Sequence, residues 1–107
     1  MDEIKLAAIK EQIAAARRRS ANLKHNDLAR IARMLGRERS AKRTNEPTYE
    51  SALLDTNVIT IPDHSKGVKK GTALNILKQF EQDVMKFTAK LAGEGKDIID
   101  LGDDYEN

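Results

Sequence analysis

The sequence predicts a single α+β domain in which helices cover one face of a small antiparallel sheet. Apolar residues recur at helical spacing in the first and last thirds of the chain, and a β-branched run lies between them. A chain of 107 residues suits one domain with one modest core. Because aromatic residues make up only 4% of the composition, that core should be mainly aliphatic.

The chain is expected to begin with a helix over residues 2–20. This stretch lacks Gly and Pro and is dominated by Ala, Glu, Lys and Arg, which are strong helix formers. Its apolar side should be formed by Ile4, Ala8, Ile9, Ile13 and Ala16. The helix ends in Arg17-Arg18-Arg19. These cations either complement the negative end of the helix dipole or contact a phosphate, and both interpretations stay open.

A second helix is predicted to follow, with Asn26 as its N-cap. The apolar residues at positions i, i+3, i+4 and i+7 form one stripe, namely Leu28, Ile31, Ala32 and Leu35. Gly36 comes directly after the stripe, where a glycine commonly ends a helix.

The middle of the chain predicts short strands. Pro47 ends any helix before it and favours an extended conformation at Glu46. Residues 49–54 are expected to form one strand and residues 58–61 another, because the second run is β-branched throughout and is stopped by Pro62. The turn residues between these runs predict an antiparallel hairpin. A third strand is expected from residues 38–44.

The last predicted element is a long helix that follows a loop over residues 63–71. Thr72 is a suitable N-cap for it. Apolar residues then recur every three or four positions and should face the core, namely Ala73, Ile76, Leu77, Phe80, Val84, Phe87 and Leu91. Gly93 and Gly95 are expected to end the helix, which leaves residues 93–107 as an acidic, flexible tail.

The net charge of +2 conceals a strong asymmetry along the chain. Residues 1–44 hold twelve Lys/Arg and five Asp/Glu, a net +7, whereas residues 91–107 hold one Lys and six Asp/Glu, a net −5. The basic half suggests an anionic partner, although Arg-rich helices are often simply solvated. The apolar runs are too short to span a membrane, and the acidic start is unlike a signal peptide, so we expect a cytoplasmic protein.

Several classes of site are excluded by composition. The chain has no cysteine, which rules out disulfides, thiolate metal ligands and a cysteine nucleophile. The two histidines and the adjacent Asp63-His64 pair give only a weak metal-site pattern, so no metal site is predicted.

A helix-turn-helix unit is a distant alternative for the basic half, and it would make the protein a DNA-binding regulator. Residues 31–36 resemble the first helix and turn of that motif. A recognition helix should then carry apolar anchors, whereas this chain offers Arg37 and Lys42 at those positions. Pro47 would also break that helix.

The junction between the last predicted strand and the last helix carries a more specific pattern. It consists of Ile61-Pro62-Asp63-His64-Ser65, then Lys69-Lys70-Gly71-Thr72-Ala73, then Ile76-Leu77-Lys78-Gln79. This combination resembles the HicA family of small bacterial toxins. Leu35-Gly36 and the distance from Gly36 to Tyr49 extend the likeness upstream, so that it covers about residues 26–87.

The resemblance implies a fold, an activity and a partner. The fold is a double-stranded-RNA-binding-domain-like α-β-β-β-α unit, which would occupy residues 23–92 behind an N-terminal helical extension over residues 1–22. The implied activity is cleavage of mRNA without a metal or other cofactor. The implied partner besides RNA is a HicB-like antitoxin that covers the active surface.

The resemblance also points to a catalytic pair. The catalytic histidine of the family aligns with Glu46, in Thr44-Asn45-Glu46-Pro47. A carboxylate at this position can act as general base on a ribose 2′-OH, and His64 can act as general acid on the leaving oxygen. In the alternative, Glu46 marks a relative that binds RNA or an antitoxin without cutting RNA, and His64 only positions its loop.

Basic residues around this pair are candidate RNA contacts. Lys69 and Lys70 precede the start of the last helix, whose free N–H groups together with Thr72 would favour a phosphate. The remaining candidates are Lys42, Arg43 and Lys78. Each of these cations has solvation as its simpler interpretation.

Overall fold

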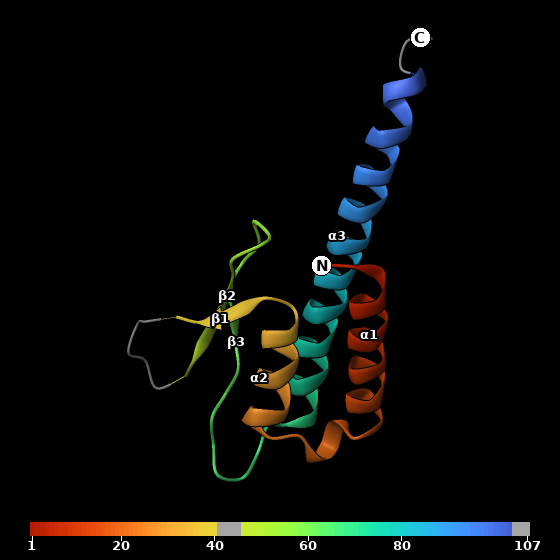
Figure 1. Ribbon diagram of the computed structural model, residues 1–107. Coiled ribbons are helices and arrows are strands. Elements are labelled where there is room, and N and C mark those ends of the chain that lie inside the picture. Colours follow the sequence, from red (N-terminus) through yellow and green to blue (C-terminus); the bar gives the residue numbers. More distant parts are fainter. Residues whose placement is uncertain (41–45, 104–107) are drawn as a thin grey trace.

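The protein is an α+β domain that confirms the predicted order of elements. The structure is a computed structural model that describes residues 1–40 and 46–103, with side chains up to residue 93. Its elements are α1 (Glu3–Arg18), the 3₁₀ turn η1 (Ser20–Asn22), α2 (His25–Met34), β1 (Arg37–Arg39), β2 (Thr48–Ser51), β3 (Ile59–Thr60) and α3 (Lys70–Asp103). The order from α2 to α3 is therefore α-β-β-β-α, preceded by one additional helix (Figure 1).

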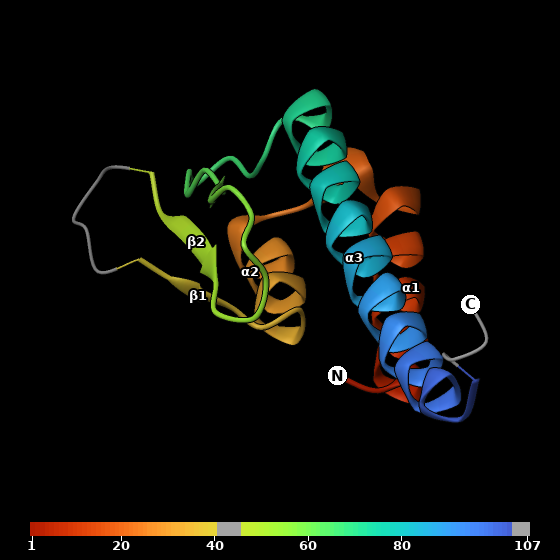
Figure 2. The same ribbon diagram turned by 90° about the horizontal axis from the view of Figure 1, so that it is seen from above.

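The three strands form one antiparallel sheet in the order β1-β2-β3. Tyr49 of β2 pairs with Arg39 of β1 on one side and with Ile59 of β3 on the other. β2 and β3 are shorter than predicted, and β1 begins directly after Gly36 rather than one residue later. The helices lie on one side of this sheet, as expected (Figure 2).

α1 packs along α3 through a stripe that keeps Ile9, Ile13 and Ala16 of the predicted one but replaces Ile4 and Ala8 with Leu6. The buried residues of α1 are Leu6, Ile9, Ile13 and Ala16. Ile4 is 84% exposed and Ala8 is exposed as well, so their assignment to the core was wrong. The reason is the spacing: starting from Leu6, steps of three and four residues reach Ile13 and Ala16 but leave positions 4 and 8 at the edge.

α2 begins one residue before the predicted cap. Lys24 is the N-cap residue, and the carboxylate of Asp27 accepts a hydrogen bond from its backbone N–H over 2.9 Å, so Asn26 lies inside the helix rather than capping it. The predicted stripe is confirmed, since Leu28, Ile31, Ala32 and Leu35 are all buried. Gly36 ends the helix with a φ of 82°, as predicted for a glycine in this place.

α3 differs from the prediction at both ends. Lys69 O accepts a hydrogen bond from Ala73 N–H over 2.8 Å, so the helix starts at Lys70 and Thr72 lies inside it rather than capping it. The predicted apolar stripe is buried from Ala73 to Phe87. The helix then continues through Gly93 and Gly95 to Asp103, because an interior glycine costs only about 1 kcal/mol relative to alanine. In the described part of the chain, no helix is both long and apolar enough to cross a bilayer.

Candidate functional site

An open cleft of about 820 Å³ lies where the loop before α3 meets η1 and the first turn of α3. Five of the residues predicted from the sequence line this single cleft, namely Glu46, His64, Lys69, Lys70 and Thr72. The structure therefore brings together side chains that are separated by up to 26 positions in the chain.

Strand pairing explains why Glu46 and His64 share the cleft. β2 and β3 are antiparallel neighbours, so the residue before β2 and the residue after β3 lie at the same end of the sheet. The Ile61 N–H extends the ladder by donating to Pro47 O over 3.0 Å. Glu46 directly precedes Pro47, and Pro62 directly follows Ile61. The segment before β2 and the segment after β3 therefore enter the cleft side by side.

The loop that carries His64 is fixed by two backbone hydrogen bonds. The Gly67 N–H donates to His64 O over 3.0 Å and closes a turn. The Val68 N–H donates to Leu23 O over 2.9 Å and ties the loop to the segment between α1 and α2. Gly67 has a φ of 89°, and a Cβ atom there would lie 3.0 Å from Leu23 O, so the turn requires glycine.

Two buried side chains, His25 and Tyr49, hold the end of β3 from which this loop starts. His25 lies with its Nδ1 atom 3.1 Å from Ile61 O and its Nε2 atom 2.9 Å from the Tyr49 hydroxyl oxygen. A carbonyl oxygen only accepts, so Nδ1 carries the proton that it donates to Ile61 O, and Nε2 accepts from the Tyr49 hydroxyl in the neutral ring. The pair therefore holds the end of β3 at the point where the chain turns toward His64.

The cleft carries a small excess of positive charge. Its lining includes Lys66, Lys69 and Lys70 against Glu46 and Asp63. None of the three lysines forms an ion pair with any residue in the described part of the chain. The first N–H groups of α3, which have no partner within the helix, lie at the same place. Ammonium groups and helix N–H groups together favour an anion such as a phosphate.

The remaining predicted contacts do not join the cleft. Lys42 and Arg43 lie outside the residues that the structure describes. Lys78 is exposed on α3 but is not among the residues that line the cleft. Conversely, sequence reasoning did not select two residues that line the cleft. They are Lys66, in the loop before α3, and Ala21, in η1.

The helix-turn-helix interpretation is wrong. The chain after Gly36 forms strand β1, not a second helix. Arg37, which was considered at the position of an apolar anchor, is 2% exposed. It donates to both carboxylate oxygens of Asp83 in α3, so its charge is neutralised inside the protein and is not presented to a nucleic acid.

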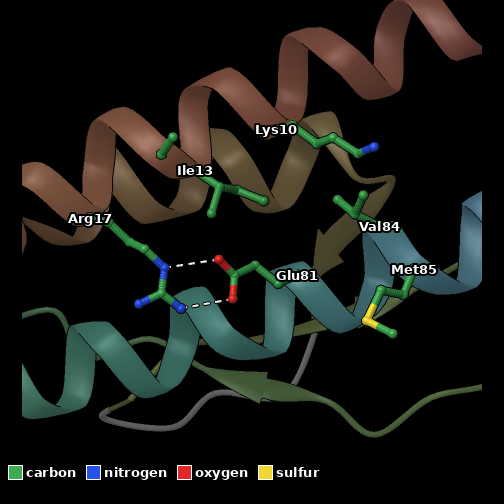
Figure 3. Close-up of a pocket in the computed structure, with 7 residues that line it drawn as sticks. Lys10, Ile13, Arg17, Glu81, Val84 and Met85 are labelled. Atoms are coloured by element: carbon green, nitrogen blue, oxygen red, sulfur yellow. Dashed lines mark hydrogen bonds and ion pairs between the residues drawn. The ribbon is translucent and has the colours of Figure 1, made fainter.

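The arginines at the end of α1 are also engaged within the protein. Arg17 forms a two-point ion pair with Glu81 of α3, at the edge of a groove of about 290 Å³ between the two helices (Figure 3). The hydrogen bonds from Arg17 lower the pKa of the Glu81 carboxyl below its usual value. Arg19 lies 3.7 Å from Asp27. These contacts favour a structural role for Arg17 and Arg19 over a phosphate contact.

Other chemistry is sparse in the described part of the chain. Among the side chains that the structure describes, in residues 1–40 and 46–93, no three His, Asp or Glu gather in a way that could hold a metal ion. Two carboxylates, an imidazole and three ammonium groups around one open cleft can transfer protons and bind an anion. No family model, curated protein or solved structure matches this chain.

Proposed function

We propose that this protein is a HicA-like RNA endonuclease, a toxin that inhibits translation by cutting mRNA and is neutralised by a HicB-like antitoxin. The observation that supports this proposal is the single cleft shared by Glu46, His64, Lys69, Lys70 and Thr72. The motif that resembles the HicA family supplies four of these residues, and the count along the chain supplies Glu46. Such an enzyme would act in the cytoplasm, where mRNA is found.

The proposed reaction is a transesterification at one phosphodiester. Glu46 takes the proton of the ribose 2′-OH, and the 2′-oxygen attacks the adjacent phosphorus. The bond from phosphorus to the 5′-oxygen breaks, and protonated His64 gives its proton to that leaving oxygen. A 2′,3′-cyclic phosphate and a free 5′-hydroxyl result, with no metal needed to balance the step. Lys69 and Lys70 would hold the phosphate oxygens.

A second candidate function is a relative that binds RNA or an antitoxin without cutting RNA. It is favoured by Glu46, which stands where the resemblance expects histidine. A relative that binds RNA would use the same cleft and the same backbone charge as the enzyme, so salt-dependent binding does not separate these two candidates.

A ribonuclease assay on the purified full chain, with chelator present and antitoxin absent, separates the two candidates. Glu46→Gln and His64→Ala should each lower cleavage by about a hundredfold or more while RNA affinity changes only a few-fold, because each removes one positioned acid or base. Glu50→Gln is the matched control, since Glu50 is an exposed carboxylate of β2 that does not line the cleft. Its activity should equal that of the wild type.

The outcome of this assay decides the proposal. A wild-type protein that binds RNA but cleaves none under these conditions would refute the enzyme and favour the binder. Glu46→His sharpens the test. Cleavage activity that appears only in this variant would identify the natural chain as a relative that has lost catalysis. A small antitoxin-like reading frame beside the gene would support the partner.

A further inference from the structure

We propose that the segment between α1 and α2 forms one wall of the RNA-binding cleft, and that Lys24 is a further phosphate-binding residue. This inference rests on the RNA-binding part of the proposed function. Residues 20–24 precede the stretch that resembles the HicA family, which begins at about residue 26.

Backbone contacts place this segment against the cleft. Ala21 of η1 is itself one of the residues that line the cleft. Leu23 O accepts the hydrogen bond from Val68 N–H at 2.9 Å, which joins the segment to the loop of His64. Figure 1 shows the turn between α1 and α2 beside the start of α3. A backbone hydrogen bond therefore joins the segment to the loop without help from a side-chain contact.

Lys24 adds a positive charge to this wall. Lys24 is not itself a lining residue, but its Cγ atom lies 3.8 Å from the place where Gly67 would carry a Cβ atom, so the start of its side chain lies beside a residue that lines the cleft. Lys24 is exposed and forms no ion pair with a described residue, because Asp27 accepts only from its backbone N–H. The ammonium group is free to bind an anion from solvent.

With Lys24, lysines approach the cleft from two separated segments. Lys66, Lys69 and Lys70 line the cleft from the loop and the first turn of α3, whereas Lys24 belongs to the segment between α1 and α2 and lies at the edge of the cleft beside Gly67. A single phosphate can be held by the lysines of one segment. Cations from two segments suit a ligand with several phosphates, which is the chemistry of an RNA strand rather than a mononucleotide.

The test compares Lys24→Ala with Lys5→Ala in the full chain. Lys5 is an exposed lysine near the other end of α1, so the control removes the same charge away from the cleft. Binding of a fluorescent single-stranded RNA is measured between about 50 and 200 mM salt. Lys24→Ala should weaken binding several-fold at low salt and reduce the slope of log K against log salt by about 0.7, the value for one phosphate of a single strand. Lys24→Arg should restore both, and Lys5→Ala should change neither.

A second variant guards against an indirect effect. Ala21→Glu places a negative charge on the exposed wall and should also weaken RNA binding, with the far-ultraviolet circular dichroism of the wild type retained. If the wild type binds RNA while Lys24→Ala and Ala21→Glu bind as tightly as Lys5→Ala, the inference is refuted and the proposed function stands. A wild type that binds no RNA refutes both.

Discussion

Arg37 and Asp83 form a buried two-point ion pair that joins strand β1 to helix α3. Arg37 Nε donates to Asp83 Oδ2 over 2.6 Å, and Nη2 donates to Oδ1 over 2.9 Å. The remaining donors of the guanidinium reach Tyr49 O, Asn57 O and the Thr56 hydroxyl. One side chain therefore fastens the sheet, the turn before β3 and the long helix to each other.

Removing the carboxylate should be severely destabilising. Asp83→Ala leaves the Arg37 charge buried without its partner, and we expect a loss of about 3–5 kcal/mol in the free energy of unfolding. Urea denaturation measures this loss. Asp55→Ala is the control, because Asp55 is exposed and its removal should change stability by less than about 0.5 kcal/mol. Equal midpoints for the two variants would show that the ion pair contributes nothing to folding.

The hydroxyl of Tyr49 should matter through His25. Tyr49→Phe keeps the ring in the core but leaves the buried Nε2 atom of His25 without its donor, and a loss of about 1–3 kcal/mol follows. The double variant with His25→Leu should be less destabilised than the sum of the single variants, because it removes both polar groups. Strict additivity of the two losses in urea denaturation would contradict the bond. Thr60→Val, at an exposed position of β3, should have little effect.

Gly67 should be the glycine that is least tolerant of substitution near the cleft. Gly67→Ala puts a side chain on a backbone with a φ of 89° and against Leu23 O, so we expect a loss of at least about 1–2 kcal/mol together with weaker RNA binding. Gly71→Ala is the matched control within α3, because nothing lies within 4 Å of the added Cβ atom. It should be neutral or stabilising by up to about 1 kcal/mol. Thermal unfolding ranks the two variants, and the opposite order would refute this account of the turn.

The ion pair between Arg17 and Glu81 should make a small, pH-dependent contribution to stability. Because the pKa of Glu81 is lowered in the folded state, the contribution is present above the pKa of the unfolded chain and is lost as the pH falls through the folded pKa. Both side chains are about 40% exposed, so solvent screening limits the contribution to about 0–1 kcal/mol. Glu81→Gln should therefore lower the melting temperature slightly at neutral pH and not at all in strong acid. A deficit that persists unchanged in acid would point to packing instead.

The helices and the hairpin could be predicted because their patterns are local. The stripe from Leu28 to Leu35 and the stripe from Ala73 to Phe87 need only a helical period to be recognised. β1 was placed less well, since Arg37-Glu38-Arg39 has no apolar residue and its first residue is buried only because Asp83 lies 46 positions away. The start of α3 was misplaced for a similar reason, as Lys69 supplies a backbone carbonyl where the sequence suggests a hydroxyl cap at Thr72.

The candidate site residues that belong to a continuous sequence motif could be predicted, whereas those that tertiary contacts bring to the cleft could not. His64, Lys69 and Lys70 belong to one continuous motif, and antiparallel pairing brings Glu46 to the same end of the sheet. Ala21 and Lys24 could not be selected, because a backbone hydrogen bond between Leu23 and Val68 leaves no mark on side-chain composition. Lys78 belongs to the sequence motif but lies too far along α3 to line the cleft.

The unbroken course of α3 gives the molecule a large electrical dipole. One end of this 34-residue helix lies at the basic cleft, and the other end carries four acidic residues between positions 94 and 103, the nearest of them about 35 Å away at 1.5 Å per residue. That separation is several times the screening length of about 8 Å at physiological salt, so the acidic end cannot neutralise the cleft within the same molecule. A polyanion such as RNA should instead attract the cleft and repel the far end of the rod. These opposite forces would rotate the protein before any contact forms, so that it approaches the RNA strand with its cleft first.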